Sequence, residues 1–307
     1  MRIETIRNKA LITGTVVTSI IYLIWRIFFT IPFGEGIIAL ISGMYLLIVE
    51  IVGMLEEVVH YNNMTNIEYP MIPKADFSEF PDVDIFIATY NEPVELLYKT
   101  INGCINMEYP DENKVHIYIC DDSNRIEMKK LAEEMNINYI TRTERKDAKA
   151  GNFNNALAKT DSPLVVTFDA DMIPMHDFLM STVPYFVEDL TNAKKIEKKD
   201  GKEARKNRKG KIGFIQTPQS FYNPDLFQYN LFSETRIPNE QDYFYRDIQI
   251  SRNKSNSVIY GGTNTVISRE ALDEIGGFYT KVITEDFATG ILIQSNGYTC
   301  YAIDEVH

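Results

Sequence analysis

Two aspartates, Asp169 and Asp171, follow directly after the apolar run LVVTF at residues 164–168. The run is rich in β-branched and aromatic residues, which predicts a strand buried on both faces. If the strand period of two persists, both carboxylates point to one side, where their repulsion favours a divalent cation between them. The alternative is a pair of solvated loop acids, because an isolated D-x-D motif is short.

Other acidic residues are predicted to share this position in a sheet. The runs VDIFIAT (83–89) and VHIYIC (115–120) predict two more strands, and Asp121 and Asp122 directly follow the second run. In open α/β sheets, ligands bind beyond the carboxyl ends of the strands. Because the acids converge at such an edge, the metal site is favoured over the solvated loop.

The elements between these motifs alternate in type. Helices are predicted over residues 94–106, 125–135 and 149–159, with a short strand near Tyr139. Together with the three strands they give a βαβαβ order. This order predicts an α/β fold whose mostly parallel sheet carries helices on both faces.

A phosphate-bearing ligand at this edge needs positive charge. The sequence has no GxGxxG after the first strand and no GxxxxGK followed by Ser or Thr, so neither a dinucleotide fingerprint nor a P-loop is predicted. Lys149, within AKAGN (148–152), can add a cation beside a metal that neutralises a diphosphate. The alternative for Lys149 is a solvated lysine at the start of a helix.

Composition limits the class of protein. The 307 residues are 45% hydrophobic, which is enough for one large α/β domain plus an appendage. The formal net charge of −12 argues against a nucleic-acid-binding protein, so we predict no nucleic-acid partner. Cys104, Cys120 and Cys300 show no CxxC spacing, which predicts neither a disulfide framework nor a zinc site and fits a reducing compartment. Cys120 ends an apolar strand and is expected to be buried.

The N-terminal part of the chain is strongly apolar. Residues 10–31 and 36–55 each reach the ~20 apolar residues of a membrane-spanning helix when extended over one charge, and we predict a transmembrane hairpin. Arg26 is expected near one membrane interface and Glu50 near the other. A cleaved signal peptide fits poorly because there are two segments, and a buried hairpin of a soluble protein stays open.

Charge flanking this hairpin predicts its orientation. Basic residues precede the first segment, whereas the turn at 32–35 contains no Lys or Arg, so the N-terminus is predicted to be cytosolic. Two crossings return the chain to the cytosol at the cell membrane. The predicted organisation is a hairpin at 1–57, a membrane-surface linker at 58–81 and a cytosolic α/β domain at 82–307.

Seven short motifs occur in a recognisable order. They are TYNEP (89–93), CDD (120–122), AKAGN (148–152), FDAD (168–171), QTP (216–218), ALDEIGGF (271–278) and TED (284–286). In this order they resemble family 2 glycosyltransferases, and most of all the catalytic subunits of processive bacterial cellulose synthases. The resemblance implies a GT-A fold and inverting transfer of glucose from UDP-glucose to the hydroxyl end of a growing β-glucan such as cellulose, with Mg²⁺ or Mn²⁺.

The resemblance also implies a role for each motif residue. The uridine would be held by Thr89, Tyr90, Glu92, Asp121 and Asp122, and the diphosphate would be approached by Lys149. The metal would be bound by Asp169 and Asp171. The acceptor path would be lined by Gln216, Thr217 and Pro218, and the catalytic position would be formed by Thr284, Glu285 and Asp286. Asp286 would be the general base, since inverting transfer needs a carboxylate to take the proton of the acceptor hydroxyl. From the residues alone, Asp286 can instead cap a helix over 286–295.

Two departures from the family pattern qualify the resemblance. Gly261 stands where the cellulose synthases commonly have a Cys, which leaves the acceptor geometry open. The family continues to a Gln/Arg-x-x-Arg-Trp motif and further membrane helices, whereas this sequence ends at His307, so we expect a fragment that does not polymerise alone. The alternatives are a synthase for a mixed-linkage glucan, chitin or hyaluronan, and a catalytically silent scaffold that binds nucleotide sugars.

Two further stretches have open interpretations. Residues 191–211 carry ten basic and three acidic side chains, which fits a solvated loop or a contact with anionic lipid or an accessory synthase subunit. The aromatic stretch 242–250 fits either an interfacial helix or core packing.

Overall fold

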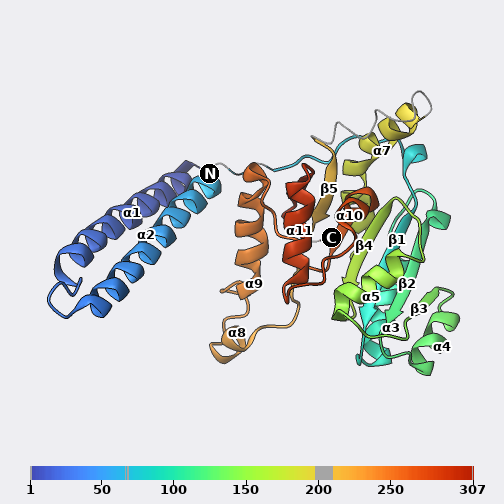
Figure 1. The fold of residues 1–307 in the computed structure, drawn as a ribbon. Coiled ribbons are helices and arrows are strands. Elements are labelled where there is room, and N and C mark those ends of the chain that lie inside the picture. The colour runs from blue at the N-terminus through green and yellow to red at the C-terminus, as the bar shows by residue number, and fades with distance from the viewer. Residues whose placement is uncertain (1, 66, 68, 198–209, 306) are drawn as a thin grey trace. The chain divides into compact units, whose positions relative to one another are not determined.

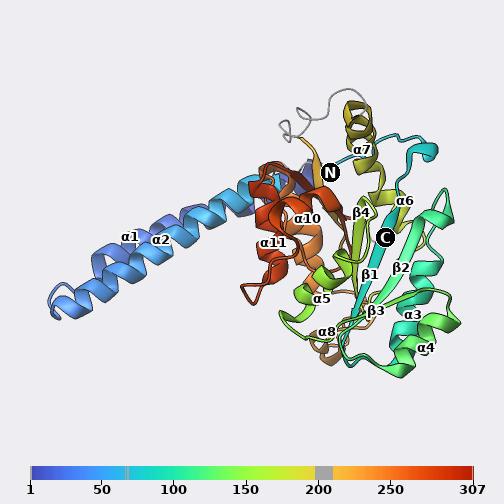
Figure 2. The same cartoon turned by 45° about the vertical axis from the view of Figure 1, so that its right-hand side comes forward.

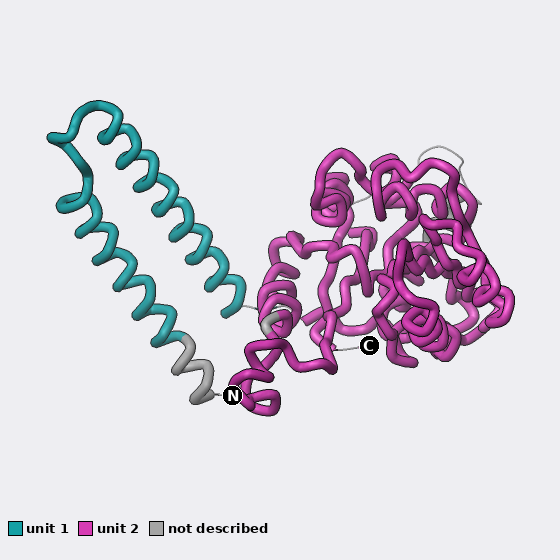
Figure 3. The backbone as a smooth tube through the Cα atoms, turned by 90° about the horizontal axis from the view of Figure 1, so that it is seen from below, with its two compact units in different colours: residues 1–67 teal, residues 68–307 magenta. Residues whose placement is uncertain are grey.

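The chain folds into two compact units. The computed structural model describes residues 2–65, 67, 69–197, 210–305 and 307. The units comprise residues 1–67 and residues 68–307 (Figure 3).

The first unit is an antiparallel helical hairpin of α1 (Arg2–Phe29) and α2 (Ile37–Thr65), shown in Figure 1. By length and composition alone, Lys9–Phe29 and Ile37–Thr65 are long and apolar enough to cross a membrane. The helix α2 extends to Thr65, into the stretch that the sequence predicted as linker.

One expectation for this hairpin is wrong. Arg26 and Glu50 do not lie near opposite interfaces but pair across the two helices, with 3.0 Å between Arg26 Nε and Glu50 Oε2. The guanidinium also donates to the Thr30 hydroxyl, which in turn donates to the Arg26 carbonyl. Two opposite charges that share one level of an apolar hairpin compensate each other, so neither needs to reach an interface.

The second unit is built on a seven-stranded sheet in the order β3-β2-β1-β4-β6-β5-β7. The strands are β1 (Val83–Thr89), β2 (Val115–Asp121), β3 (Asn138–Thr141), β4 (Leu164–Asp169), β5 (Ile212–Gln216), β6 (Thr265–Ser268) and β7 (Thr299–Ala302). Only β6 among these strands runs antiparallel to its neighbours β4 and β5. The predicted mostly parallel α/β sheet is thus confirmed.

The register of the central strands brings their carboxyl ends together. Thr89 of β1 pairs with Asp121 of β2, and Ala88 of β1 pairs with Asp169 of β4. Residues Leu164–Phe168 of β4 are all buried, as expected for a strand covered on both faces. The motif residues at these strand ends therefore meet at one edge of the sheet.

The helices cover both faces of the sheet, as Figures 1 and 2 show. The helices of the second unit are α3 (Val94–Ile105), α4 (Ile126–Glu134), α5 (Ala148–Leu157), α6 (Phe178–Thr182), α7 (Pro184–Glu197), α8 (Leu226–Asn230), α9 (Glu240–Asp242), α10 (Arg269–Ile275) and α11 (Glu285–Ser295). Short 3₁₀ turns occupy Phe77–Glu79, Glu112–Lys114 and Asn253–Ser255, and Tyr243–Gln249 forms a π-helix, η4.

Alternation along β1 shows how the two faces are filled. Ile85 and Ile87 join a large apolar cluster with Leu97 of α3 and Phe178 of α6. Phe86, between them in sequence, points to the other face and lies 6.2 Å from the ring of Phe153 in α5. This period of two places α3 and α5 on opposite faces of one buried strand.

Two predicted surface stretches can now be located. The basic stretch 191–211 begins inside α7, which ends at Glu197, and residues 198–209 lie outside the described residues. Within 242–250, Tyr245, Gln249 and Ile250 are buried, whereas Tyr243 is half exposed. Core packing therefore accounts for one face of this stretch.

Candidate active site

A cavity of about 480 Å³ opens at the carboxyl edge of β1, β2 and β4. Its lining comes from the ends of these strands and from the start of α5: Ala88, Thr89, Tyr90, Glu92, Asp122, Arg142, Arg145, Ala148, Lys149, Asn152 and Asp169. We call it the nucleotide pocket below, after the role that the resemblance to family 2 glycosyltransferases implies for it. Six of the predicted site residues therefore line a single cavity.

The turn after β1 is organised by the Glu92 carboxylate. Glu92 Oε2 accepts hydrogen bonds from the Thr89 hydroxyl at 2.7 Å and from the N–H groups of Tyr90 and Asn91 at 2.7 and 3.2 Å. Burial acts to raise the pKa of Glu92, but these hydrogen bonds together hold it below its ordinary value. The Tyr90 ring is left half exposed, with the Arg145 guanidinium 5.4 Å from its centre.

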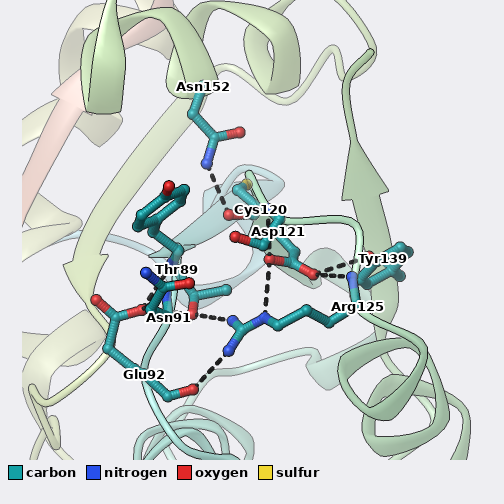
Figure 4. Close-up of polar contacts among 10 residues, drawn as sticks. Thr89, Asn91, Glu92, Cys120, Asp121, Arg125, Tyr139 and Asn152 are labelled. Carbon is teal, nitrogen blue, oxygen red and sulfur yellow. Dashed lines mark hydrogen bonds and ion pairs between the residues drawn. The ribbon is translucent and has the colours of Figure 1, made fainter. Parts of the chain in front are cut away.

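Asp121 is turned into the protein rather than into the pocket (Figure 4). Its Oδ2 accepts from the N–H of Arg125 at 2.7 Å and from the Tyr139 hydroxyl at 3.0 Å. The Arg125 guanidinium continues to the Thr89 hydroxyl and to the Glu92 carbonyl, at 2.6 and 2.7 Å. Burial, followed by the bond to Asp121, raises the pKa of Tyr139 to about 12. Asp121 therefore ties the end of β2 to the turn after β1.

Asp122 lines the pocket and receives a two-pronged contact from Arg142. Arg142 Nε lies 2.6 Å from Asp122 Oδ1, and Arg142 Nη2 lies 2.8 Å from Oδ2. The same guanidinium donates to the carbonyls of Lys146 and Ala148. Asp147 and Ala148 have φ values of 63° and 43°, a left-handed conformation that non-glycine residues rarely adopt. Arg142 thus holds a strained turn that leads directly into Lys149.

Lys149 and Asp169 form an ion pair across the pocket, with 2.5 Å between Nζ and Oδ1. β4 ends at Asp169, so Asp171 lies in the following turn and is exposed. The expected strand period does not persist to Asp171, and the two carboxylates do not share one strand face. Among the described residues, no third His, Cys, Asp or Glu gathers with them. A half-buried and an exposed carboxylate still suit a hard divalent cation that keeps several waters.

Asp286 lies in the first turn of α11, close to Lys149. A Cβ atom on Gly262 would lie 3.1 Å from Asp286 Oδ2 and 3.4 Å from Lys149 Nζ, and Gly262 has a φ of +76°. Both charged groups can approach this backbone only because position 262 is glycine. Thr284, not Asp286, is the N-cap residue of α11, and no side-chain cap bond forms there. Asp286 Oδ1 accepts from the Phe287 N–H at 2.7 Å.

The residues of the QTP motif, Gln216, Thr217 and Pro218, are buried next to the segment that contains Gly262. Gln216 Nε2 donates to the carbonyls of Thr217 and Thr263, both at 2.9 Å. Gln216 Oε1 accepts from the Gly261 N–H and from the Thr265 hydroxyl, both at 2.8 Å. The oxygen and the nitrogen of the Gln216 side chain are therefore both bonded within the protein.

Several residues of the site were not found by sequence reasoning. They are Arg125, Arg142, Arg145 and Asn152. The arginines follow strand ends at the same sheet edge, which is a usable signal for partners of the acids. Asn152 is buried, and its side-chain N–H donates to the Cys120 carbonyl at 2.7 Å. Its Oδ1 is shielded from solvent and accepts no hydrogen bond from any described residue.

Comparison with known proteins gives a consistent result. Residues 84–276 match the profile described as Glycosyl transferase family 2. Cellulose synthase 1 of Komagataeibacter xylinus is 33% identical over 285 residues, which are 92% of this chain and 17% of that protein. The UDP-forming cellulose synthase catalytic subunit of Pseudomonas fluorescens is 32% identical over 297 residues, which are 94% of this chain and 36% of that protein. The chain thus spans a minor part of both relatives.

A solved structure supports the fold. Mannosyltransferase PcManGT from Pyrobaculum calidifontis, in complex with GDP-Man and Mn²⁺, matches with a TM-score of 0.53 at 20% identity. The match covers 81% of this chain and 62% of the mannosyltransferase. Together with the profile match over residues 84–276, this shows that the chain belongs to glycosyl transferase family 2 and has a GT-A-like fold.

Proposed function

We propose that this chain is the catalytic part of a membrane-bound, inverting, UDP-sugar glycosyltransferase that transfers glucose to the hydroxyl end of a β-glucan such as cellulose. The observation that carries the proposal is the placement of Lys149. It pairs with Asp169 at the nucleotide pocket and meets the same glycine backbone as Asp286 of α11. Lys149 therefore lies between the proposed site of the diphosphate and the proposed general base.

The nucleotide pocket supplies the donor side. Thr89, Tyr90, Glu92 and Asp122 would hold the uridine, with Asp121 fixing the loop that presents them. The half-exposed Tyr90 ring offers a face on which a base can stack. The cavity of about 480 Å³ falls within the usual range for a ligand of this size.

A divalent metal would be held by Asp169 and Asp171, because carboxylate oxygens are the ligands that Mg²⁺ and Mn²⁺ prefer. Such an ion would neutralise charge that develops on the departing diphosphate. Lys149 adds a second positive charge there. Since Asp169 already pairs with Lys149, the two cations would share its carboxylate.

Asp286 would act as the general base. The acceptor hydroxyl attacks the anomeric carbon, its proton passes to Asp286, and the bond from that carbon to UDP breaks on the opposite side. A new glycosidic bond forms with inverted configuration. Asp286 lies in the first turn of α11, where the helix dipole stabilises the carboxylate before it accepts the proton.

Membrane attachment rests on the helical hairpin of residues 1–67. Two helices of sufficient length and apolar character, preceded by basic residues, support a cell-membrane anchor with residues 68–307 in the cytosol. Lipids would then be constant partners of the hairpin. The basic stretch 191–211 would add contacts with lipid headgroups or with an accessory subunit.

Calorimetric titration of the chain with UDP tests the donor half of the proposal. We expect binding in Mg²⁺ or Mn²⁺ that weakens at least tenfold in EDTA and in Asp171→Ala, and weaker binding of GDP than of UDP. A Kd of UDP that is unchanged both in EDTA and in Asp171→Ala would contradict the metal site.

Incubation of the intact membrane-bound protein with single UDP-sugars, followed by linkage-specific glycanases, tests the acceptor half. We expect UDP-glucose to yield a β-glucan. Binding of UDP without turnover of any UDP-sugar would instead identify a silent nucleotide-sugar-binding subunit.

A further inference from the structure

Glu92 is the one acid lining the nucleotide pocket that forms no ion pair in the part of the chain that the structure describes. Of the other two acids in the lining, Asp122 pairs with Arg142 and Asp169 pairs with Lys149. All hydrogen bonds that other described residues donate to the Glu92 carboxylate reach Oε2. Glu92 Oε1 therefore keeps its capacity to accept a hydrogen bond from a ligand.

The Arg125 guanidinium fixes Glu92 in two ways (Figure 4). Its Nη1 donates to the Glu92 carbonyl at 2.7 Å, and its Nη2 donates to the Thr89 hydroxyl at 2.6 Å. Because a guanidinium has only donors, the Thr89 oxygen has to accept this bond, and the one proton of the hydroxyl is directed to Glu92 Oε2 at 2.7 Å. Arg125 thus fixes the backbone of Glu92 directly and its carboxylate through Thr89.

Arg125 has no guanidinium nitrogen left for a ligand. Its third nitrogen, Nε, lies 3.3 Å from Asp121 Oδ1, and the side chains of Arg125 and Asp121 are 14% and 0% exposed. The buried carboxylate compensates the charge of the guanidinium. Arg125 is also not among the residues that line the nucleotide pocket. It can therefore influence a bound nucleotide only through Thr89 and Glu92.

A second buried arginine offers a comparison at the opposite edge of the sheet. Arg269 pairs with Asp84 at 2.8 Å, and these side chains are 12% and 1% exposed. Arg269 also donates to the Thr160 hydroxyl and to two backbone carbonyls. Asp84 lies near the start of β1, whereas Thr89 ends this strand. The two arginines thus have similar partners, but the contacts of Arg125 lead into the nucleotide pocket.

We infer that Arg125 is a positioning residue for the donor nucleotide: through the Thr89 hydroxyl and the Glu92 carbonyl it orients Glu92 Oε1 to accept a hydrogen bond from an N–H or hydroxyl group of the nucleoside. A carboxylate accepts but does not donate, so this contact selects a nucleoside that presents a donor at that point. The inference rests on the proposed function, because it requires a UDP-sugar in the pocket.

Calorimetric titration of the full chain in Mg²⁺ with UDP and three analogues is the test. The analogues 2′-deoxy-UDP, 3′-deoxy-UDP and N3-methyl-UDP each lack one donor of the nucleoside. We expect at least one of them to bind the wild type about tenfold more weakly than UDP, as for loss of one hydrogen bond to a charged group. Arg125→Lys should lose this preference, because an ammonium group cannot bond Asp121, Thr89 and the Glu92 carbonyl in the geometry of a guanidinium.

Arg269→Lys is the matched control, because it makes the same change at an arginine of similar burial. Both lysine variants should lower the melting temperature, but Arg269→Lys should keep the preference for UDP. Glu92→Gln should lose the preference without touching Arg125. Its amide oxygen has to face the three donors at Oε2, which turns its NH₂ group to the position of Oε1.

Two variants of Thr89 test the path through the hydroxyl and remain informative if Arg125→Lys does not fold. Thr89→Val removes the hydroxyl and should lose the preference for UDP, whereas Thr89→Ser keeps the hydroxyl and should retain it. A preference that survives in Thr89→Val would overturn the inference.

Further outcomes would also overturn the inference. They are a preference that survives in Arg125→Lys, weakening of UDP and all three analogues by one common factor, and equal binding of UDP and all three analogues by the wild type. Loss of the preference in Arg269→Lys would do the same. Absence of UDP binding in the wild type would instead refute the proposed function.

Discussion

The proposed donor and acceptor sides of the site hold their polar groups in different ways. At the nucleotide pocket, Asp122 pairs with Arg142 and Asp169 pairs with Lys149. On the acceptor side, Asp286 accepts from one neighbouring backbone N–H. The donor side is assembled by charge pairs between side chains. The proposed acceptor side is shaped by the glycine backbone at position 262, which Asp286 approaches closely.

This difference predicts which kinetic quantity a substitution changes. Loss of a group that meets only the reacting hydroxyl lowers kcat, whereas loss of a group that shapes the nucleotide pocket raises the KM for the donor. A clean separation would support two independent half-sites. Mixed effects would show that the two sides are coupled through Lys149.

The largest effect is expected from Asp286→Asn on the acceptor side. The amide cannot take the proton of the acceptor hydroxyl, and loss of a general base lowers rates by ~10²–10⁴-fold. Polymer synthesis in membranes should fall by this factor, while calorimetry should give an unchanged Kd for UDP. Polymer synthesis that survives undiminished would disprove the assignment of the base.

Gly262→Ala should come next in size. The substitution forces alanine into a left-handed conformation and places its methyl group 3.1 Å from Asp286 Oδ2 and 3.4 Å from Lys149 Nζ. We expect a roughly tenfold to hundredfold fall in kcat, because small displacements of reacting groups have effects of this size.

Gly297→Ala separates backbone strain from this contact. Gly297 has a φ of +92° with no atom within 4 Å of a Cβ, so alanine there brings similar strain without touching the site. It should lower the melting temperature and leave kcat unchanged. Equal losses of kcat in both variants would refute the contact.

Arg142→Ala on the donor side should have a moderate effect. It removes the paired contact to Asp122 and releases the strained turn at Asp147 and Ala148. We expect the KM for the UDP-sugar to rise about tenfold with kcat changed little, as for loss of a charged hydrogen-bond pair. Arg142→Lys should rescue only part of this loss, because the ammonium group of lysine cannot form the two parallel hydrogen bonds that the planar guanidinium makes to Asp122. Full rescue by lysine would show that charge alone matters.

The smallest effect is a pH dependence of stability from Glu92. Its pKa is lower in the folded chain than the ordinary value of 4.5, so its contribution is complete above that value. The contribution is lost as the pH falls from there through the folded pKa. The difference in melting temperature between the wild type and Glu92→Gln should therefore be greatest at neutral pH and shrink below 4.5. A difference that grows towards acid pH would contradict this account.

The sequence was most informative where apolar runs end in acids. The strands that precede Asp121 and Asp169 could be recognised because buried parallel strands are continuous apolar runs, and their carboxyl ends have to meet at one edge. The seven ordered motifs then indicated the family. The predicted burial of Cys120 is confirmed as well, and burial raises the pKa of its thiol.

The sequence was less informative where the outcome depends on side-chain direction. Nothing in the local pattern shows that the Asp121 carboxylate turns inward to Arg125, since that depends on where a neighbouring loop passes. The pairing of Arg26 with Glu50 depends on how two helices align across a turn. The surroundings of Tyr245 escaped prediction because this residue lies on a π-helix, which has no reliable sequence signal.

The antiparallel strand β6 has a consequence for how such a chain can diversify. Thr265 at its start pairs with Thr167 of β4 and with Gln216 of β5, so the segment before it, including Gly261 and Gly262, crosses the active edge between two strand ends. That segment can change without altering the parallel strands that carry the nucleotide pocket. We therefore expect acceptor preference to diverge among close relatives through a few positions around 259–264, while the choice of nucleotide is inherited unchanged.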